Sequence, residues 1–214
     1  MFTTDLKMKR AETCAVISSS PTLLDNDYGK LIDQYDVVVR CNKAFVNGYE
    51  KYVGSKTNIR FINNHITDYL VNPSYWASHP AFVKETTWET IPFETILDGE
   101  VLIYTHAVPS HENLCSTLPG YEFHDMRKFA PYAYSEPGKR LTTGGNAIYT
   151  CSNIFEKVDC FCFEFFSSAN PRDVKTQDRI HYFEEVKDWG GGTSHNFDIE
   201  NKFLQNIDNV NFIS

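Results

Sequence analysis

Several features that would place this chain in a familiar class are missing from its 214 residues. No apolar run reaches the roughly 18 residues of a membrane-spanning helix, and residues 1–10 lack the apolar stretch of a secretory signal. Basic side chains are fewer than acidic ones, 20 against 28, and the net charge of −8 argues against a general binder of nucleic acid or anionic membranes. We therefore expect a cytoplasmic protein without a nucleic-acid partner or a membrane span, in which local groups hold any anionic ligand.

Cysteine is also scarce, at 6 residues, which is too few for a disulfide scaffold of this length. No Cys-x-x-Cys pair is present, and this disfavours a structural zinc site. Most of the cysteines lie in apolar runs, where buried free thiols are the expected state. These features fit a reducing compartment.

The residues that are present predict an α/β fold. Apolar residues make up 42% of the chain, and its length suits a single domain, 1–214, with one buried core. Short apolar runs bounded by polar turns are typical of buried strands in a parallel sheet. We expect such strands at 14–17, 35–40, 58–62, 101–104 and 158–163. Intervening helices, one of them capped by Thr142 or Thr143, complete a doubly wound, Rossmann-like, mainly parallel sheet with helices on both faces.

Two segments are expected to lie over the carboxyl edge of this sheet, where ligands bind in such folds. The segment 73–134 is rich in proline, serine, histidine and aromatic residues, and it predicts loops and short helices. The segment 187–197 contains three consecutive glycines and predicts a hinge-like lid. A last helix should follow, in which Ile199, Phe203 and Ile207 recur at helical spacing.

Glycine-rich phosphate loops of the Walker and Gly-x-Gly-x-x-Gly kinds are absent. In their place Ser18-Ser19-Ser20-Pro21-Thr22 follows the first predicted strand. Hydroxyls and backbone N–H groups at a strand-to-helix turn can bind a phosphate. An ordinary helix-capping turn is the alternative for these residues.

Several other short stretches stand in a fixed order along the chain. They are Cys14-Ala15-Val16-Ile17, Arg40-Cys41-Asn42, Val53-Gly54-Ser55-Lys56-Thr57, Thr142-Thr143-Gly144, His181-Tyr182-Phe183-Glu184, and His195 with Glu200 in a His-x-x-x-x-Glu pattern. In order and spacing they resemble the sialyl motifs of the animal-type sialyltransferases, and Arg40-Cys41-Asn42 is also similar to the small bacterial sialyltransferases. The resemblance implies the sialyltransferase-type variant of the GT-A fold and an enzyme of glycan biosynthesis.

The resemblance further implies an inverting transfer of sialic acid from CMP-sialic acid to a sugar hydroxyl of a glycan, such as a galactose-terminated one. A nucleoside monophosphate leaves with less charge than a diphosphate, so neither a metal nor another cofactor is expected. His195 would be the general base, since an imidazole with a pKa of about 6.5 can accept a proton near pH 7. His181 would assist catalysis at the leaving phosphate. A surface histidine at the start of a helix is the alternative for His195.

The implied donor-binding set comes from strand ends and one helix N-terminus. It consists of Ser18, Ser19, Ser20, Asn42, Asn63, Thr142, Thr143, Gly144 and Tyr182. Tyr182 would donate to the departing phosphate, and the helix N-terminus would hold CMP or the sialic carboxylate. Packing of Tyr182 on a helix face and simple capping by the threonines are the alternatives. Glu200 lies about 140° around the helix from His195, so a structural role that ties the helix to the loops is expected.

Three departures from the family pattern keep other functions open. Ser19 stands where the animal family has an asparagine that contacts the nucleotide, and Phe155 stands where the disulfide partner of Cys14 is expected. We therefore expect free thiols. The family's Golgi anchor and stem have no counterpart in the chain as given. A CMP-Kdo transferase and a non-catalytic CMP-binding relative remain alternatives, as does a metal-dependent transferase in which Asp25 and Asp27 bind manganese.

Overall fold

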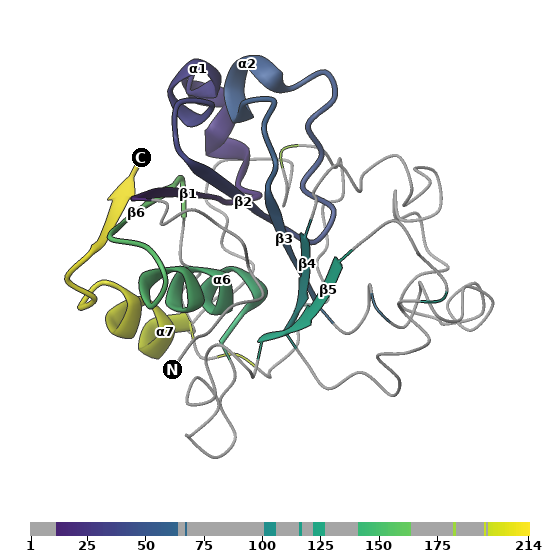
Figure 1. Cartoon of the computed structure of the whole chain (residues 1–214). Helices are drawn as coiled ribbons and strands as arrows, with labels where there is room; N and C mark the ends of the chain where they lie inside the picture. The colour runs from purple at the N-terminus through teal and green to yellow at the C-terminus, as the bar shows by residue number, and fades with distance from the viewer. Residues whose placement is uncertain are drawn as a thin grey trace, which may run out of the picture.

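The computed structural model contains one sheet of seven strands, and every neighbouring pair of strands is parallel (Figure 1). It describes residues 12–63, 67, 101–105, 116, 122–126, 141–163, 182, 195 and 197–214. The strands are β1 (Thr13–Ile17), β2 (Val37–Cys41), β3 (Ile59–Ile62), β4 (Val101–Tyr104), β5 (Glu122–Asp125), β6 (Lys157–Phe161) and β7 (Val210–Ile213). The helices described are η1 (Pro21–Asp25, a 3₁₀ helix), α1 (Gly29–Ile32), α2 (Glu50–Val53), α6 (Thr143–Ser152) and α7 (Phe197–Leu204).

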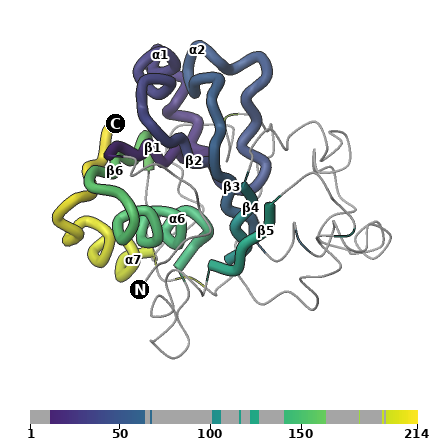
Figure 2. The backbone as a smooth tube through the Cα atoms, viewed as in Figure 1, coloured from purple at the N-terminus to yellow at the C-terminus, as the bar shows by residue number. Residues whose placement is uncertain are grey.

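The strand order, β5-β4-β3-β2-β1-β6-β7, confirms the doubly wound fold. From β1 the chain steps outward through β2 to β5, and it then returns to add β6 and β7 on the other side of β1. The first described strand and the last are therefore separated only by β6, as the tube in Figure 2 shows. The direction of winding reverses between β1 and β6. In folds of this kind the ligand site lies outside the carboxyl ends of the strands at that reversal.

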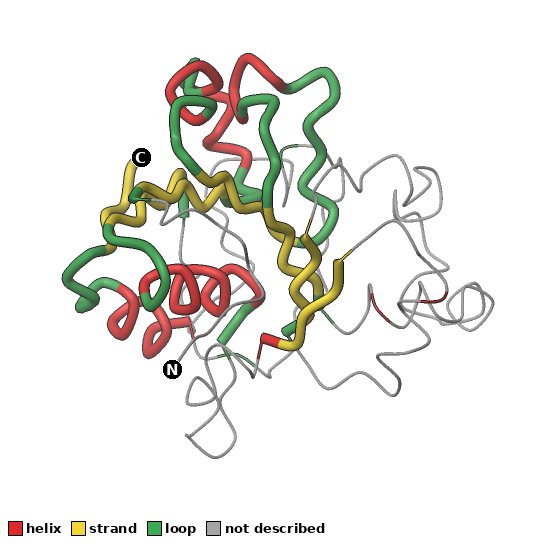
Figure 3. Tube along the Cα trace, viewed as in Figure 1, coloured by secondary structure: helices red, strands yellow, loops and turns green. Residues whose placement is uncertain are grey.

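Both faces of the sheet are covered, which explains why the central strands are apolar throughout. All five residues of β2 are buried. Val37 and Val39 belong to the core under α6 and α7, whereas Val38 belongs to the core under α1 and α2. The two pairs of helices lie on opposite sides of the strands in Figure 3. A side chain on either face of β2 is thus removed from water, so an alternating polar pattern would be unfavourable.

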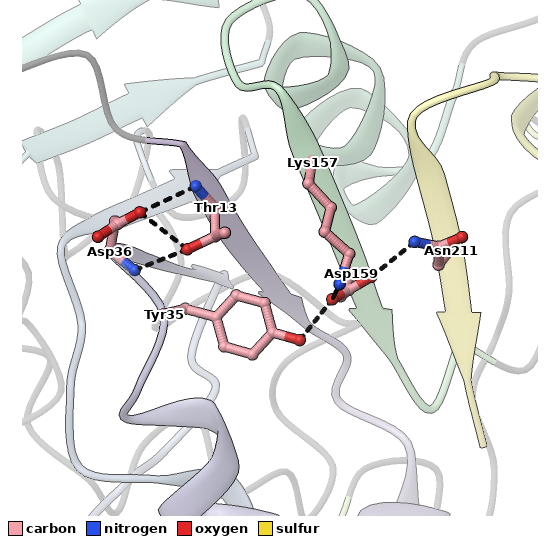
Figure 4. A network of polar contacts seen from close by, with 6 residues as sticks. All are labelled: Thr13, Tyr35, Asp36, Lys157, Asp159 and Asn211. Atoms are coloured by element: carbon pink, nitrogen blue, oxygen red, sulfur yellow. Dashed lines mark hydrogen bonds and ion pairs between the residues drawn. The ribbon is translucent and has the colours of Figure 1, made fainter.

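A buried carboxylate joins β6 to β7 and to the segment before β2, on the side of the sheet opposite α6. Asp159 of β6 accepts hydrogen bonds from Tyr35 at 2.5 Å and Asn211 at 2.9 Å, and it pairs with Lys157 at 2.6 Å (Figure 4). Burial by itself would raise the pKa of Asp159, but the hydrogen bonds from Lys157, Tyr35 and Asn211 hold it below its ordinary value of 3.8. The charged carboxylate therefore holds β7 and the segment before β2 against β6.

All five predicted strands are present, with ends that differ by a few residues. β5 and β7, which the sequence did not predict, are the two edge strands. Their short sequences, Glu-Phe-His-Asp and Val-Asn-Phe-Ile, contain both polar and apolar residues, because an edge strand does not need to be apolar on both faces. Thr142 is the cap of α6, as predicted. The five described cysteines, Cys14, Cys41, Cys151, Cys160 and Cys162, are free and buried, as expected.

The last helix was predicted correctly, but its buried face was not. α7 buries Phe197, Glu200 and Leu204, whereas Ile199 and Phe203 are 41% and 42% exposed. A charged residue occupies the inner face because its carboxylate has hydrogen-bond donors there, as described below. The segments 73–134 and 187–197, predicted as loops and a lid, lie mostly outside the described residues. No helix within the described ranges is long and apolar enough to cross a membrane.

Candidate active site

Three of the predicted donor-binding segments lie at one edge of the sheet. Ser18–Ser20 follow β1, Asn42 follows β2 and Asn63 follows β3. Because these strands are parallel neighbours, their carboxyl ends meet at the same edge. Residues that are about 45 positions apart in sequence are thus brought to the same side of the molecule by topology alone.

The side chain of Asn42 ties the ends of β2 and β3 together. Its Oδ1 accepts a hydrogen bond from the Asn63 N–H at 3.0 Å, and its own N–H donates to the Phe61 carbonyl at 2.7 Å. Asn42 adopts a left-handed backbone conformation, with φ of 49°, which asparagine tolerates better than most residues. Its Nδ2 has no hydrogen-bond partner in the described part of the chain, so this donor is available to a ligand at the carboxyl edge.

The serine turn after β1, residues 18–20, is hydrogen-bonded to the segment that follows β6. Ser18 Oγ donates to the Cys162 carbonyl at 2.6 Å and accepts from the Ser20 N–H at 3.0 Å. Ser20 Oγ caps η1 by accepting from the Thr22 N–H at 3.3 Å. Ser20 is therefore a helix cap, which is the alternative stated above for this turn. Ser18 instead links the end of β1 to the end of β6. Ser19 contributes its carbonyl to Tyr182, and its hydroxyl makes no contact among the described residues.

The N-terminus of α6 lies at this same edge, beside the end of β6. The evidence is the close packing of Gly144 on Phe163, the second residue after β6: a Cβ at Gly144 would come within 2.8 Å of the Phe163 ring. Thr142 caps the helix, and its Oγ1 accepts from the Gly145 N–H at 3.0 Å. The N–H groups of Thr143 and Gly144 have no partner among the described residues, as is usual for a first helical turn.

Both donors of Thr142 are used by Glu200. The Thr142 N–H lies 2.8 Å from Glu200 Oε2, and the Thr142 hydroxyl lies 2.5 Å from Glu200 Oε1. The threonine hydroxyl predicted to contact the donor is therefore part of a helix cap, and the amides that follow it are the groups open to an anion. Glu200 does tie its helix to the rest of the fold, in agreement with its expected structural role.

His195 lies two residues before α7, and its ring is 6.1 Å from the ring of Phe197. Burial raises the pKa of Glu200, while the hydrogen bonds from Thr142 and the positive charge of protonated His195 oppose that rise. The imidazole is thus within electrostatic reach of Glu200. His181, its predicted partner in catalysis, lies outside the described residues.

Tyr182 differs from its predicted orientation. The residue is fully buried, its hydroxyl donates to the Phe45 carbonyl, and its ring packs edge-on against Tyr49 at 5.1 Å. The backbone N–H donates to the Ser19 carbonyl at 3.0 Å. Because the O–H donor is used by Phe45, it is not open to a phosphate, and the residue packs from a turn rather than from the helix face of the alternative. Tyr182 instead holds the turn after β1 against the loop after β2.

Two positioning residues were not predicted for the site. Arg60 is fully buried, and its Nη1 donates to the carbonyls of Asn42 and Ala44, at 2.9 and 3.0 Å. The sequence signal was an arginine inside an apolar strand, which requires partners that the sequence alone does not identify. The other is Tyr49, whose ring packs against Tyr182.

The acidic pair Asp25 and Asp27 shows no feature of a metal site. Asp27 pairs with Lys51 at 3.0 Å. Among the residues that the structure describes, no group of three or more His, Cys, Asp or Glu side chains is arranged to hold a metal ion. The manganese alternative therefore gains no support from this region.

Comparison with known proteins links the first part of the chain to one family. The model of glycosyltransferase family 29 (sialyltransferase) matches residues 2–90. A β-galactoside α-2,6-sialyltransferase 2 of Bos taurus is 40% identical over 93 residues, which are 42% of this chain and 18% of the relative. The first part of the chain is thus similar to the sialyltransferase family.

Another relative extends the match over most of the chain. A β-1,6-galactosyltransferase of Arabidopsis thaliana is 29% identical over 204 residues, which are 84% of this chain and 50% of the relative. The chain thus spans about half the length of the galactosyltransferase, and its match to the bovine enzyme covers less than a fifth of that protein.

The fold agrees with that of solved members. A mammalian sialyltransferase in complex with Gal-beta-1-3GalNAc-ortho-nitrophenol matches with a TM-score of 0.53 at 19% identity, over 95% of this chain and 69% of that one. A second structure, also of a mammalian sialyltransferase, gives 0.55 at 20% identity over the same shares. The family's parallel α/β sheet is therefore the fold of this chain.

Proposed function

We propose that this chain transfers a sugar from a nucleotide-sugar donor to a hydroxyl group of a glycan, with CMP-sialic acid as the preferred donor. The observation that carries the proposal is the meeting of the serine turn, Asn42 and the N-terminus of α6 at one edge of the sheet. These segments are close to the reversal of winding between β1 and β6. Nucleotides bind at that position in doubly wound folds.

The donors at this edge suit a nucleoside monophosphate. Asn42 Nδ2 can donate to a ribose or phosphate oxygen, with Asn63 and Ser19 beside it on the neighbouring strand ends. The N–H groups of Thr143 and Gly144, which have no partner in the described part of the chain, lie at the positive end of the α6 dipole, where an anion is stabilised. A protein with a net charge of −8 needs such local donors to hold an anionic ligand.

In the proposed reaction His195 accepts the proton of the acceptor hydroxyl. The hydroxyl oxygen then forms a bond to the anomeric carbon of sialic acid from the face opposite CMP. The bond between that carbon and the phosphate oxygen breaks, CMP leaves with the electron pair, and the configuration inverts. His181 would donate to the departing phosphate as its charge grows. Since CMP carries less charge than a diphosphate, we propose that no metal is required.

A galactosyl donor is the second candidate. It is favoured by the relative that covers most of this chain, which is a galactosyltransferase, and by Ser19 in place of the asparagine of the animal sialyltransferases. The acceptor hydroxyl, the base and the edge of the sheet would serve either sugar. The difference would lie in the contacts to the base and to the sugar.

A panel of donors tests both candidates. The protein is incubated with CMP-sialic acid, CMP-Kdo or UDP-galactose, with and without a galactose-terminated acceptor, and nucleotide release is measured with added divalent metal and in EDTA. Acceptor-dependent release of CMP from CMP-sialic acid supports the proposal. Release from UDP-galactose alone supports the second candidate, and release from CMP-Kdo alone identifies a Kdo transferase. Tight binding of CMP without any release would identify a non-catalytic relative.

A further inference from the structure

The loop between β2 and α2 contains the one Asn-Gly pair in the sequence, Asn47-Gly48. The Tyr49 N–H donates to the Val46 carbonyl at 2.8 Å, and Gly48 has a φ of 86°. Residues 46–49 therefore form a type II turn, whose third position favours glycine. We propose that Asn47 is a site of spontaneous covalent modification, at which the Gly48 nitrogen attacks the asparagine side chain and isoaspartate is formed. This inference is independent of the proposed function.

The turn leaves the reacting groups of Asn47 and Gly48 accessible. Both residues are exposed, and the Asn47 side chain makes no hydrogen bond within the described part of the chain. A Cβ atom built on Gly48 would have no atom within 4 Å, so the space around the attacking nitrogen is open. Asparagine is among the thermolabile residues of proteins, and a following glycine lacks the side chain that hinders the attack.

Exposure alone does not create such a site, as a second asparagine shows. Asn153 is also exposed, but its Nδ2 donates to the Tyr149 carbonyl at 2.6 Å. The residue after it is Ile154, whose branched side chain shields the backbone nitrogen. Asn153 therefore serves as an internal reference for the reactivity of Asn47.

A proton acceptor already contacts the attacking nitrogen. The Gly48 N–H donates to Glu50 Oε2 at 3.0 Å. An amide nitrogen attacks a carbonyl carbon only as it loses its proton, and a carboxylate at hydrogen-bond distance is suited to accept that proton as a general base. Glu50 is the first residue of α2, so the helix fixes this carboxylate beside the turn.

The reaction balances with water as the one further reactant. The Gly48 nitrogen forms a bond to Cγ of Asn47 and gives its proton to Glu50. The bond between Cγ and Nδ2 then breaks, and the departing nitrogen takes the proton back from Glu50 and leaves as ammonia. Water opens the resulting five-membered succinimide at either carbonyl. Opening at one carbonyl gives aspartate, and opening at the other gives isoaspartate.

The isoaspartate product changes the main chain, whereas aspartate changes only a surface charge. Isoaspartate adds a methylene group to the backbone at position 47, so the hydrogen bond between Tyr49 and Val46 cannot keep its geometry. The ring of Tyr49 packs against the rings of Phe45 and Tyr182, at 6.4 and 5.1 Å. Displacing Tyr49 loosens this packing, and the modified chain should therefore melt at a lower temperature.

The experiment follows the full chain in warm neutral buffer over time. Peptide mass spectrometry measures the gain of about 1 Da at Asn47 when the amide becomes a carboxyl group, and enzymatic methylation measures the isoaspartate. Glu50→Gln keeps a side-chain oxygen next to Gly48 but removes the base. Asp27→Asn is the matched control, because it removes an exposed acidic charge that pairs with Lys51 on the same helix. Asn47→Asp supplies the charge without the isomer.

We expect the native chain to react at Asn47 and not at Asn153, with isoaspartate as the main product. Glu50→Gln should slow the reaction severalfold, and Asp27→Asn should not. The modified native chain should melt below Asn47→Asp, which should melt with the unmodified chain.

The absence of a mass gain at Asn47, or a gain no faster than at Asn153, would overturn the inference. An unchanged rate in Glu50→Gln would remove Glu50 as the base. Should that variant fail to fold, Glu50→Asp replaces it, since its shorter side chain draws the carboxylate back from the Gly48 nitrogen.

Discussion

Arg60 Nη1 lies 2.9 Å from the carbonyl oxygen of Asn42, so a fully buried guanidinium on β3 supports the residue that ends β2. The same nitrogen donates to the Ala44 carbonyl at 3.0 Å. These two hydrogen bonds fix the backbone of the turn that carries Asn42. This contact makes the shape of the candidate site depend on a residue that does not reach the edge itself.

Replacing Arg60 with leucine should weaken donor binding as well as the fold. The change leaves two buried carbonyls without donors, which costs about 1–3 kcal/mol of unfolding free energy. Urea denaturation measures this loss, and calorimetry with CMP measures the fall in affinity. Arg40→Leu is the control: Arg40 is equally buried but donates to the carbonyls of Val53 and Gly54, in the segment leading into β3. It should lower stability and leave CMP affinity unchanged, whereas equal effects on affinity would argue against a specific role for Arg60.

His195→Ala should keep CMP binding and lower transfer by roughly 100-fold or more, which is the scale of general-base catalysis. The native chain and the variant are compared by steady-state kinetics with the donor that the panel identifies. Near-native turnover in the variant would show that another group accepts the proton. His124→Ala serves as the control, since that histidine pairs with Glu122 on the edge strand β5 and should not affect the rate.

Asn42→Asp should weaken CMP binding by about tenfold, roughly 1.4 kcal/mol, while the fold is retained. Aspartate keeps the oxygen that accepts from the Asn63 N–H, but it replaces the Nδ2 donor with negative charge that faces the phosphate. Calorimetry at two salt concentrations separates the repulsion, which salt screens, from the lost donor. Asn47→Asp makes the same chemical change at an exposed position of the same loop. If both variants bind CMP equally well, Asn42 is not a ligand contact.

Asp159 should make the fold sensitive to acid. Its pKa in the folded chain is below the ordinary value of 3.8, so its contribution to stability is present above that value and is lost as the pH falls through the folded pKa. Thermal unfolding measured from pH 6 to pH 2 should show this decline. In Asp159→Asn the stability at pH 6 should be lower by about 1–3 kcal/mol, because three donors lose a charged acceptor. The decline toward pH 2 should also be shallower, and an unchanged slope would contradict the assignment.

The fold could be predicted to a large extent because its main signals are local. Runs such as Cys14–Ile17 are apolar on both faces, and only a strand covered on both sides buries such a run. The two edge strands escaped prediction since β5 and β7 carry polar residues that a loop would also tolerate. The candidate site was predictable in part, because the residue that follows each parallel strand necessarily reaches the carboxyl edge.

The uses of particular side chains were not predictable in the same way. Nothing local distinguishes a tyrosine at position 182 that faces a phosphate from one that is buried against Tyr49. Likewise, the helical spacing of Ile199 and Phe203 suggests that these two residues form the buried face of α7. In the structure both are exposed, and Glu200 lies on the buried face instead. Glu200 can be buried there because it accepts hydrogen bonds from Thr142, which lies 58 residues earlier in the chain.

By its sequence alone this chain determines a parallel α/β sheet, the edge at which the candidate site lies and the order of the motifs along that edge, because hydrophobic burial and strand direction are properties of short segments. Tertiary structure decides which donors remain open there. The donors of Thr142 are used by Glu200 and the hydroxyl of Tyr182 by Phe45, while the Nδ2 amide of Asn42 has no partner among the described residues. Hydrogen-bond partners come from segments that are distant in sequence, so the availability of a donor is known only once the fold has brought those segments together.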